Sequence, residues 1–105
     1  MFVHVSDLQV GQEDEDADTL LSRILSDLVP IYKAAKGFVA YYAIKKDNDT
    51  ATTIRIFEDQ ASFLAAVQDA AGATNQIVTD LQVTNTEHTD AEAGVASAFG
   101  PIHVP

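Results

Sequence analysis

The stretch that decides the fold runs from residue 38 to residue 57 and reads FVAYYAIK, then KDND, then TATTIRIF. The first and last of these segments are rich in aromatic and β-branched residues, which favour strands. The polar KDND segment between them has the composition of a turn. The sequence therefore predicts a hairpin with strands at Phe38–Lys45 and Thr50–Phe57. Because side chains alternate along a strand, Ile54 and Ile56 share one face and Arg55 lies on the other.

A strand and a helix precede this hairpin. Met1–Val10 carries apolar residues on much of both faces, which indicates a strand. From Leu20 onward, apolar residues recur every three or four positions, and this spacing predicts a helix that continues to about Ala35. Pro30 lacks a backbone N–H, so we expect a bend at that point of the helix. The expected end signals are an N-terminal cap at Asp16 or Asp18 and a stop at Gly37.

A second helical region follows the hairpin. Asp59 has the character of an N-terminal cap, and the residues after it predict a helix that reaches about Ala71. Gly72 is expected to interrupt this helix, because glycine weakens helices. Apolar residues at helical spacing then predict a second helical piece over Asn75–Leu81.

The last part of the chain gives weaker signals. Thr84–Thr89 is polar, and we expect it to form a loop. Ala91–Phe99 is small and apolar and is the expected fourth strand, followed by an extended tail over residues 100–105. The resulting β-α-β-β-α-β order predicts one α+β domain over residues 1–105, a ferredoxin-like sandwich with both helices on one face of an antiparallel sheet.

The predicted sheet has apolar residues on both faces, although the helices cover only one of them. An uncovered apolar face of that size is unusual for a monomer. We therefore expect a homodimer in which two sheets pack face to face as a dimeric α/β barrel.

Charge excludes several classes of partner. The 105 residues include 16 acidic and 6 basic ones, a formal net charge of −10, and no basic residue follows Arg55. Binding to nucleic acid or to an anionic membrane needs a basic surface, so neither is expected. The N-terminus lacks the pattern of a signal peptide, which predicts a cytoplasmic protein. The acidic composition fits either a salt-loving organism or an ordinary bacterium with an acidic protein.

Two segments carry a family resemblance. They are KAAKGFVAYY at residues 33–42 and IRIFEDQA at residues 54–61. The Gly-Phe before an aromatic strand, and the aromatic and acidic residues that lead into the second helix, resemble the antibiotic-biosynthesis-monooxygenase-like domains. The resemblance implies a dimeric α/β barrel with a pocket between sheet and helices. It also implies either a cofactor-independent monooxygenase acting on a small aromatic or quinol-type molecule, or a haem-degrading enzyme.

The residues that such enzymes use are largely missing, including the asparagine and tryptophan that the resemblance implies near the pocket of an oxygenase. For a haem-degrading enzyme, the resemblance implies an asparagine in the first strand, a tryptophan, and a histidine near the second helix. This chain has Ser6 and Asp7 in that strand, no tryptophan, and no histidine between His4 and His88. Haem degradation is therefore not expected. Two hypotheses stay open: a monooxygenase that needs no cofactor, and a non-catalytic homodimer of the same fold that binds a small hydrophobic or aromatic ligand or serves a structural role.

The candidate catalytic residues are His4, Ser6 and Arg55. His4 and Ser6 lie two residues apart on one strand and so share a face, where His4 could act as a general base. A lone strand histidine is more often a packing residue. Arg55 has two interpretations: a pair with a surface acid, or a buried cation that binds an anionic oxygen of a ligand. The expected pocket residues are Tyr32, Tyr41 and Phe63, although packing alone explains tyrosines in a strand.

No metal site is predicted. The acidic segment Glu13–Asp18 alternates aspartates as a calcium loop does, but Thr19 stands where the loop glycine belongs and Leu25 where the closing glutamate belongs. His88 and His103 fall in stretches without a regular predicted structure and without ligand spacing around them, which argues against zinc.

Overall fold

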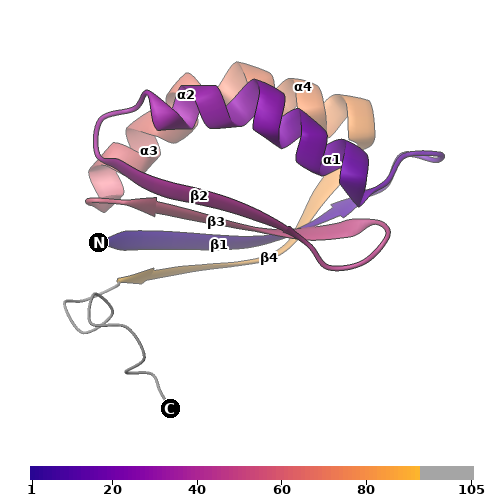
Figure 1. The fold of residues 1–105 in the computed structure, drawn as a ribbon, viewed down its shortest axis with the longest axis horizontal. Coiled ribbons are helices and arrows are strands. Elements are labelled where there is room, and N and C mark those ends of the chain that lie inside the picture. The colour runs from indigo at the N-terminus through magenta and orange to yellow at the C-terminus, as the bar shows by residue number, and fades with distance from the viewer. Residues whose placement is uncertain (93–105) are drawn as a thin grey trace, which may run out of the picture.

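The hairpin lies at one side of a four-stranded antiparallel sheet, as the sequence predicts. The computed structural model describes residues 1–92. Strands β2 (Phe38–Lys45) and β3 (Thr50–Phe57) have the predicted bounds, and β1 covers Phe2–Val10. With β4 (Val83–Glu92), the strand order is β2-β3-β1-β4. All helices of residues 1–92 lie on one face of this sheet (Figure 1), so the fold is the predicted α+β ferredoxin-like arrangement.

The first helical region changes its winding before Pro30. It consists of α1 (Ala17–Arg23), a π-helical turn η1 (Ile24–Leu28) and α2 (Val29–Lys33), with Pro30 in the first turn of α2. The proline ring would crowd the carbonyl group four residues earlier in a regular helix, and the wider π turn accommodates it. The predicted bend thus takes the form of a π turn, and the helix ends at Lys33 rather than at about Ala35.

The second helical region breaks earlier than predicted. Helix α3 (Gln60–Asp69) begins at the predicted cap Asp59, whose side chain accepts a hydrogen bond from the Ser62 backbone N–H at 2.8 Å. The break is at Ala70, and α4 (Ala71–Leu81) already contains Gly72 in its first turn. The interruption predicted at Gly72 is wrong, because the buried Ala70 marks the turn between two helices that both pack on the sheet.

Strand β4 corrects the prediction for the end of the domain. The expected loop Thr84–Thr89 lies inside this strand, which pairs with β1 from Val83 to Glu92. The predicted strand Ala91–Phe99 therefore starts too late, and its residues from 93 onward, like the predicted tail, lie outside the described residues. The reason is physical. An edge strand has one neighbour, and nearly all of β4 is exposed, so its residues carry no pattern of burial.

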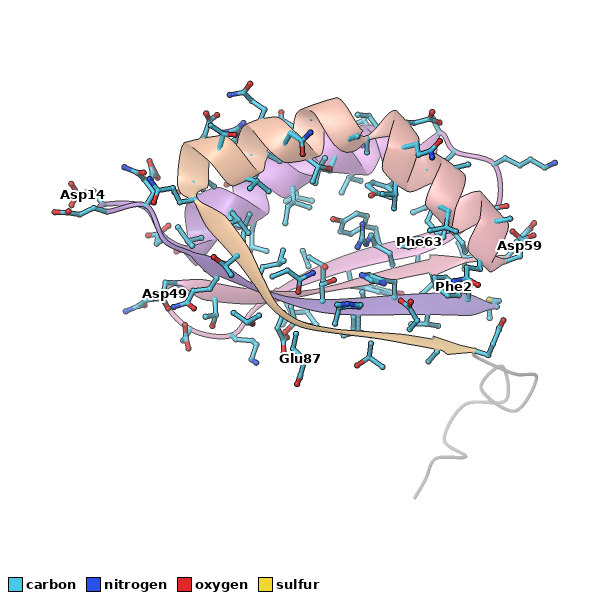
Figure 2. All side chains as sticks on the ribbon, turned by 180° about the vertical axis from the view of Figure 1, so that it is seen from behind. Phe2, Asp14, Asp49, Asp59, Phe63 and Glu87 are labelled. Atoms are coloured by element: carbon cyan, nitrogen blue, oxygen red, sulfur yellow. The ribbon has the colours of Figure 1, made fainter. Side chains whose placement is uncertain are left out.

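The core lies between the sheet and the helices. Phe57 is fully buried, and its ring contacts those of Tyr32, Phe38 and Phe63 at centroid distances of 5.7–6.2 Å. The opposite face of the sheet has no helix over it (Figure 2). In residues 1–92, no helix has the length and apolar character needed to cross a bilayer.

Candidate functional site

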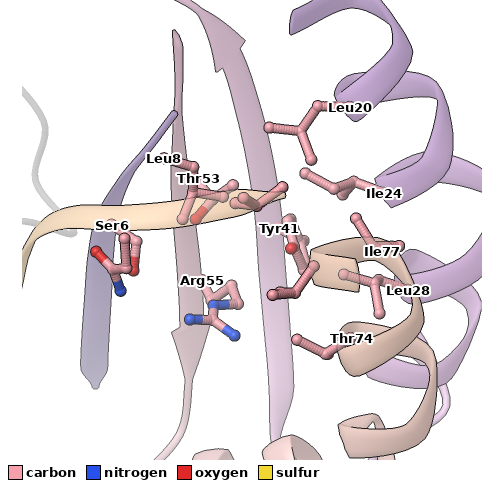
Figure 3. Close-up of a pocket in the computed structure, with 13 residues that line it drawn as sticks. Ser6, Leu8, Leu20, Ile24, Leu28, Tyr41, Thr53, Arg55, Thr74 and Ile77 are labelled. Atoms are coloured by element: carbon pink, nitrogen blue, oxygen red, sulfur yellow. The ribbon is translucent and has the colours of Figure 1, made fainter. Parts of the chain in front are cut away.

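Two adjoining cavities lie between the sheet and the helices, and Arg55 lines both of them. The first has a volume of about 250 Å³ and combines apolar side chains of the helices with polar groups of the sheet (Figure 3). The second has a volume of about 340 Å³ and lies on the side of α3 and the start of α4. The candidate residues divide between them: Ser6 and Tyr41 line the first, and His4, Tyr32 and Phe63 line the second.

Arg55 is a cation without an acidic partner in the described part of the chain. Its Nη1 donates a hydrogen bond to Tyr32 Oη at 2.8 Å, and its guanidinium carbon lies 4.9 Å from the Phe63 ring centroid. No ion pair within residues 1–92 includes Arg55. Its Nε is buried and has no hydrogen-bond partner there. The interpretation as a surface ion pair is therefore wrong, and the free Nε–H is a donor available to a ligand.

His4 is the centre of a hydrogen-bonded chain across two strands. The β-sheet register places it directly opposite Arg55 on β3 and Asp90 on β4. Its Nδ1 is hydrogen-bonded to Asp90 Oδ1, and its Nε2 lies 2.8 Å from Ser6 Oγ. An ionised carboxylate can only accept, so Nδ1 must carry the proton in that bond. In the neutral ring, Nε2 then accepts a hydrogen bond from the Ser6 hydroxyl.

Burial keeps the His4 ring neutral near pH 7. Burial is the largest influence and lowers the pKa of His4 below its usual value, and the charges of Arg55 and His88 act in the same direction. The hydrogen bond and charge of Asp90 raise the pKa but do not offset this effect. The ring is also held between two others, with centroids 5.0 Å from Phe63 and 5.6 Å from His88. His4 is thus an oriented, unprotonated base.

His88 and Asp90 belong to the site, which the sequence did not reveal. Both lie on β4, where side chains two residues apart point to the same face, and His88 is directly opposite Ser6. The prediction that His88 lies in an irregular stretch is wrong. Its neighbours in the stretch 83–91 include a valine and several threonines, the one signal that favoured a strand. His103 lies outside the described residues.

The same residues raise the question of a metal site. One ligand atom each of His4, His88 and Asp90 lie within 4.8 Å of one another. The His4 and His88 rings, however, are stacked with an interplanar angle of 24°. An imidazole binds a metal through a lone pair in its ring plane, and two stacked planes do not converge on one ion. In this arrangement the two histidine lone pairs do not point to a common position, so the geometry does not favour a metal centre.

Tyr41 and Tyr42 point to opposite faces of β2. Tyr41 lines the first cavity, and its ring meets the Tyr32 ring edge-on at 5.2 Å. Burial raises the pKa of Tyr41 to about 12, so it stays a neutral phenol near pH 7. Tyr42 is 54% exposed on the face without helices. One of the two tyrosines therefore contributes to the cavity, and the other to the outer surface.

Comparison with known proteins identifies the fold. No family model and no curated protein matches the sequence. Solved structures do. A proposed antibiotic biosynthesis monooxygenase from Deinococcus radiodurans superposes with a TM-score of 0.71 at 15% identity, over 90% of this chain and 93% of that one. SnoaB from Streptomyces nogalater, a cofactor-independent oxygenase, gives 0.71 at 15% identity over 89% and 92%.

HapK from Hahella chejuensis gives a TM-score of 0.71 at 12% identity, with 90% of this chain and 94% of that chain covered. In each pair, nearly the whole of both chains takes part, so the likeness concerns the entire domain. At these identities it establishes architecture rather than chemistry. The chain has the fold of the antibiotic-biosynthesis-monooxygenase-like domains.

Proposed function

We propose that this protein is a cofactor-independent monooxygenase acting on a small aromatic or quinol-type molecule. The observation that carries the proposal is Arg55, a cation with a free buried donor in a cavity between sheet and helices. The neutral base His4 is the directly paired residue on the adjacent strand β1. The ionisation of a phenol requires a base that takes its proton and is helped by a nearby cation that stabilises the oxygen anion.

The charge of the protein favours a substrate that arrives neutral. A net charge of −10 repels anions that approach from solution. A phenol with a pKa near that of tyrosine, about 10, is uncharged at neutral pH and enters without this penalty. It then becomes an anion only beside Arg55. Aromatic walls from Tyr32 and Phe63 suit a flat ring of this kind.

The chemistry follows from these groups. His4 takes the phenolic proton, Arg55 stabilises the oxygen anion, and the electron-rich ring system supplies electrons to molecular oxygen. At the reacting carbon, two hydrogens are lost and one oxygen atom enters as a carbonyl group. The second oxygen atom leaves as water, so O₂ is the oxidant and no further reductant is needed.

We also propose that the protein works as a cytoplasmic homodimer. Support comes from the sheet face without helices, where Tyr42 and Ile44 are 54% and 49% exposed. By register these residues lie beside Ile54 and Thr52, so an uncharged patch continues across β3. Two copies of so acidic a chain repel each other, and an uncharged patch adds nothing to that repulsion.

Oxygen consumption with a panel of anthrones and quinols tests the catalytic proposal. We expect uptake above the uncatalysed rate and a fall of at least about 100-fold in Arg55→Met, because an anion-stabilising donor contributes that much. Lys45→Met, which removes an exposed cation paired with Asp18, is the matched control and should keep the wild-type rate. Absence of uptake with ligand still bound would favour the non-catalytic homodimer.

A further inference from the structure

Ser6, His4 and Asp90 are joined in the order of a nucleophile, a base and a carboxylate. Ser6 Oγ lies 2.8 Å from His4 Nε2, and His4 Nδ1 is bonded to the Asp90 carboxylate. The two ring nitrogens are thus used as an activated serine requires, one to accept the hydroxyl proton and the other to hold the ring and stabilise its charged form.

The arrangement is rigid where it needs to be. The His4 ring is stacked between Phe63 and His88, which fixes the direction of both nitrogens. Ser6 is 2% exposed and sits in the middle of β1, paired with Thr53 on one side and His88 on the other. A nucleophile and base on one strand, with the carboxylate on the adjoining strand β4, keep their geometry better than groups on loops.

The serine also faces a space that holds a substrate and an oxyanion donor. Ser6 and Arg55 both line the cavity of about 250 Å³, and their side chains come from adjacent strands (Figure 3). Arg55 Nε has no partner among residues 1–92, so its N–H is free to meet the negative oxygen that forms when a serine attacks a carbonyl group. The rest of that cavity is mostly apolar, with Leu20, Ile24 and Leu28 from the helices.

We propose that Ser6 is a nucleophile and that the protein catalyses acyl transfer from a small, uncharged ester or thioester. Ser6 Oγ attacks the acyl carbon while its proton passes to His4 Nε2, and Arg55 stabilises the oxyanion. The leaving alcohol or thiol takes that proton as its bond to the acyl carbon breaks. Water then attacks the acyl-serine with His4 as base, releasing the carboxylic acid and restoring Ser6.

The inference goes beyond the proposed oxygenase activity and does not rest on it, because it concerns the Ser6 hydroxyl and requires no oxygen. The test treats the full-length protein with a small alkyl fluorophosphonate, which forms an O–P bond to an activated serine and releases fluoride with the serine proton. Intact mass and peptide mapping locate the label. Hydrolysis of p-nitrophenyl acetate is followed in parallel under nitrogen.

We expect one label per chain, on Ser6, and a burst of one equivalent of nitrophenol. Ser6→Ala should abolish both. His4→Ala should slow labelling by at least about 100-fold, and Asp90→Asn by about tenfold or more. Ser26→Ala removes an exposed helix serine and is the matched control, with labelling unchanged.

Three results would overturn the proposal: no label on Ser6 in the wild type, a label confined to another serine, or equal labelling of Ser6 in the wild type and in His4→Ala. Thermal unfolding of each variant shows whether the fold is retained, and Asp90→Asn, which alters an exposed side chain, gives a second measurement if His4→Ala unfolds. Oxygen uptake is measured separately, so loss of one activity does not imply loss of the other.

Discussion

At the scale of single residues, the site combines groups that burial affects in different ways. The guanidinium of Arg55 rests on the aromatic rings of Tyr32 and Phe63, a position that suits a weakly hydrated cation. His4 in the second cavity and Tyr41 in the first are both partly removed from water, and this burial favours their neutral forms. The two cavities therefore offer together a cation, an unprotonated base and a phenol that stays neutral near pH 7.

Tyr41 gives a prediction on pH. Burial raises the pKa of Tyr41 to about 12. The charge of Arg55 acts against this increase, and the electrostatic effect of Tyr32 acts with it. The unfolded chain loses this proton near pH 10, before the folded protein does, so the stability contributed by neutral Tyr41 falls between pH 10 and pH 12. In a titration of phenolate absorbance, we expect a late component that Tyr41→Phe removes and Tyr42→Phe retains. A late component that persists in Tyr41→Phe would contradict this assignment.

At the scale of elements, the connections between helices and strands position the site. Gly37, between α2 and β2, has φ of 81°, a conformation that costs little only for glycine. It lies against the start of α3, where an added Cβ would be 2.7 Å from Ser62 Oγ and 2.8 Å from Ser62 Cβ. The turn thus keeps the first helical region, the hairpin and α3 together around Tyr32 and Phe63.

Two glycines provide a matched test of this role. Gly37→Ala should lower the free energy of unfolding by at least about 1–2 kcal/mol, because it combines a left-handed backbone with a steric clash. Gly72→Ala, in helix α4 with no atom within 4 Å of the added Cβ, should raise it by about 0.5–1 kcal/mol. Urea unfolding midpoints measure both. Similar effects of the two substitutions would contradict the structural role of Gly37.

At the scale of the whole molecule, the two faces of the sheet have different tasks. The helix-covered face holds the core and the cavities, and the other face is open (Figure 1). Its exposed apolar residues are a cost to a monomer in water, which pairing with a second copy would remove. The proposed dimer thus has a physical cause that is independent of any catalytic role.

A charge placed on the open face tests this association. Ile44→Asp should shift the sedimentation coefficient at micromolar concentration from dimer to monomer, because it buries an unpaired carboxylate in the proposed interface. Leu25→Asp is the matched control: Leu25 is 63% exposed on η1, away from that face, and its substitution should leave association unchanged. A wild-type monomer at both low and high salt would reject the dimer.

The sequence by itself determined most of the architecture, because periodic burial leaves a periodic pattern: the hairpin Phe38–Phe57, the cap Asp59 and the shared face of His4 and Ser6 all follow from local spacing. The register that sets Arg55 opposite His4 comes from strand pairing in the fold. The tertiary structure alone decided the site. Strand β4 is a polar edge strand with little burial, so its pairing with β1, which brings Asp90 and His88 to His4, has no periodic signature. The absence of an acid beside Arg55 in residues 1–92 is likewise a fact of packing in three dimensions. Local patterns record which face a side chain occupies, and only the fold determines what it meets there.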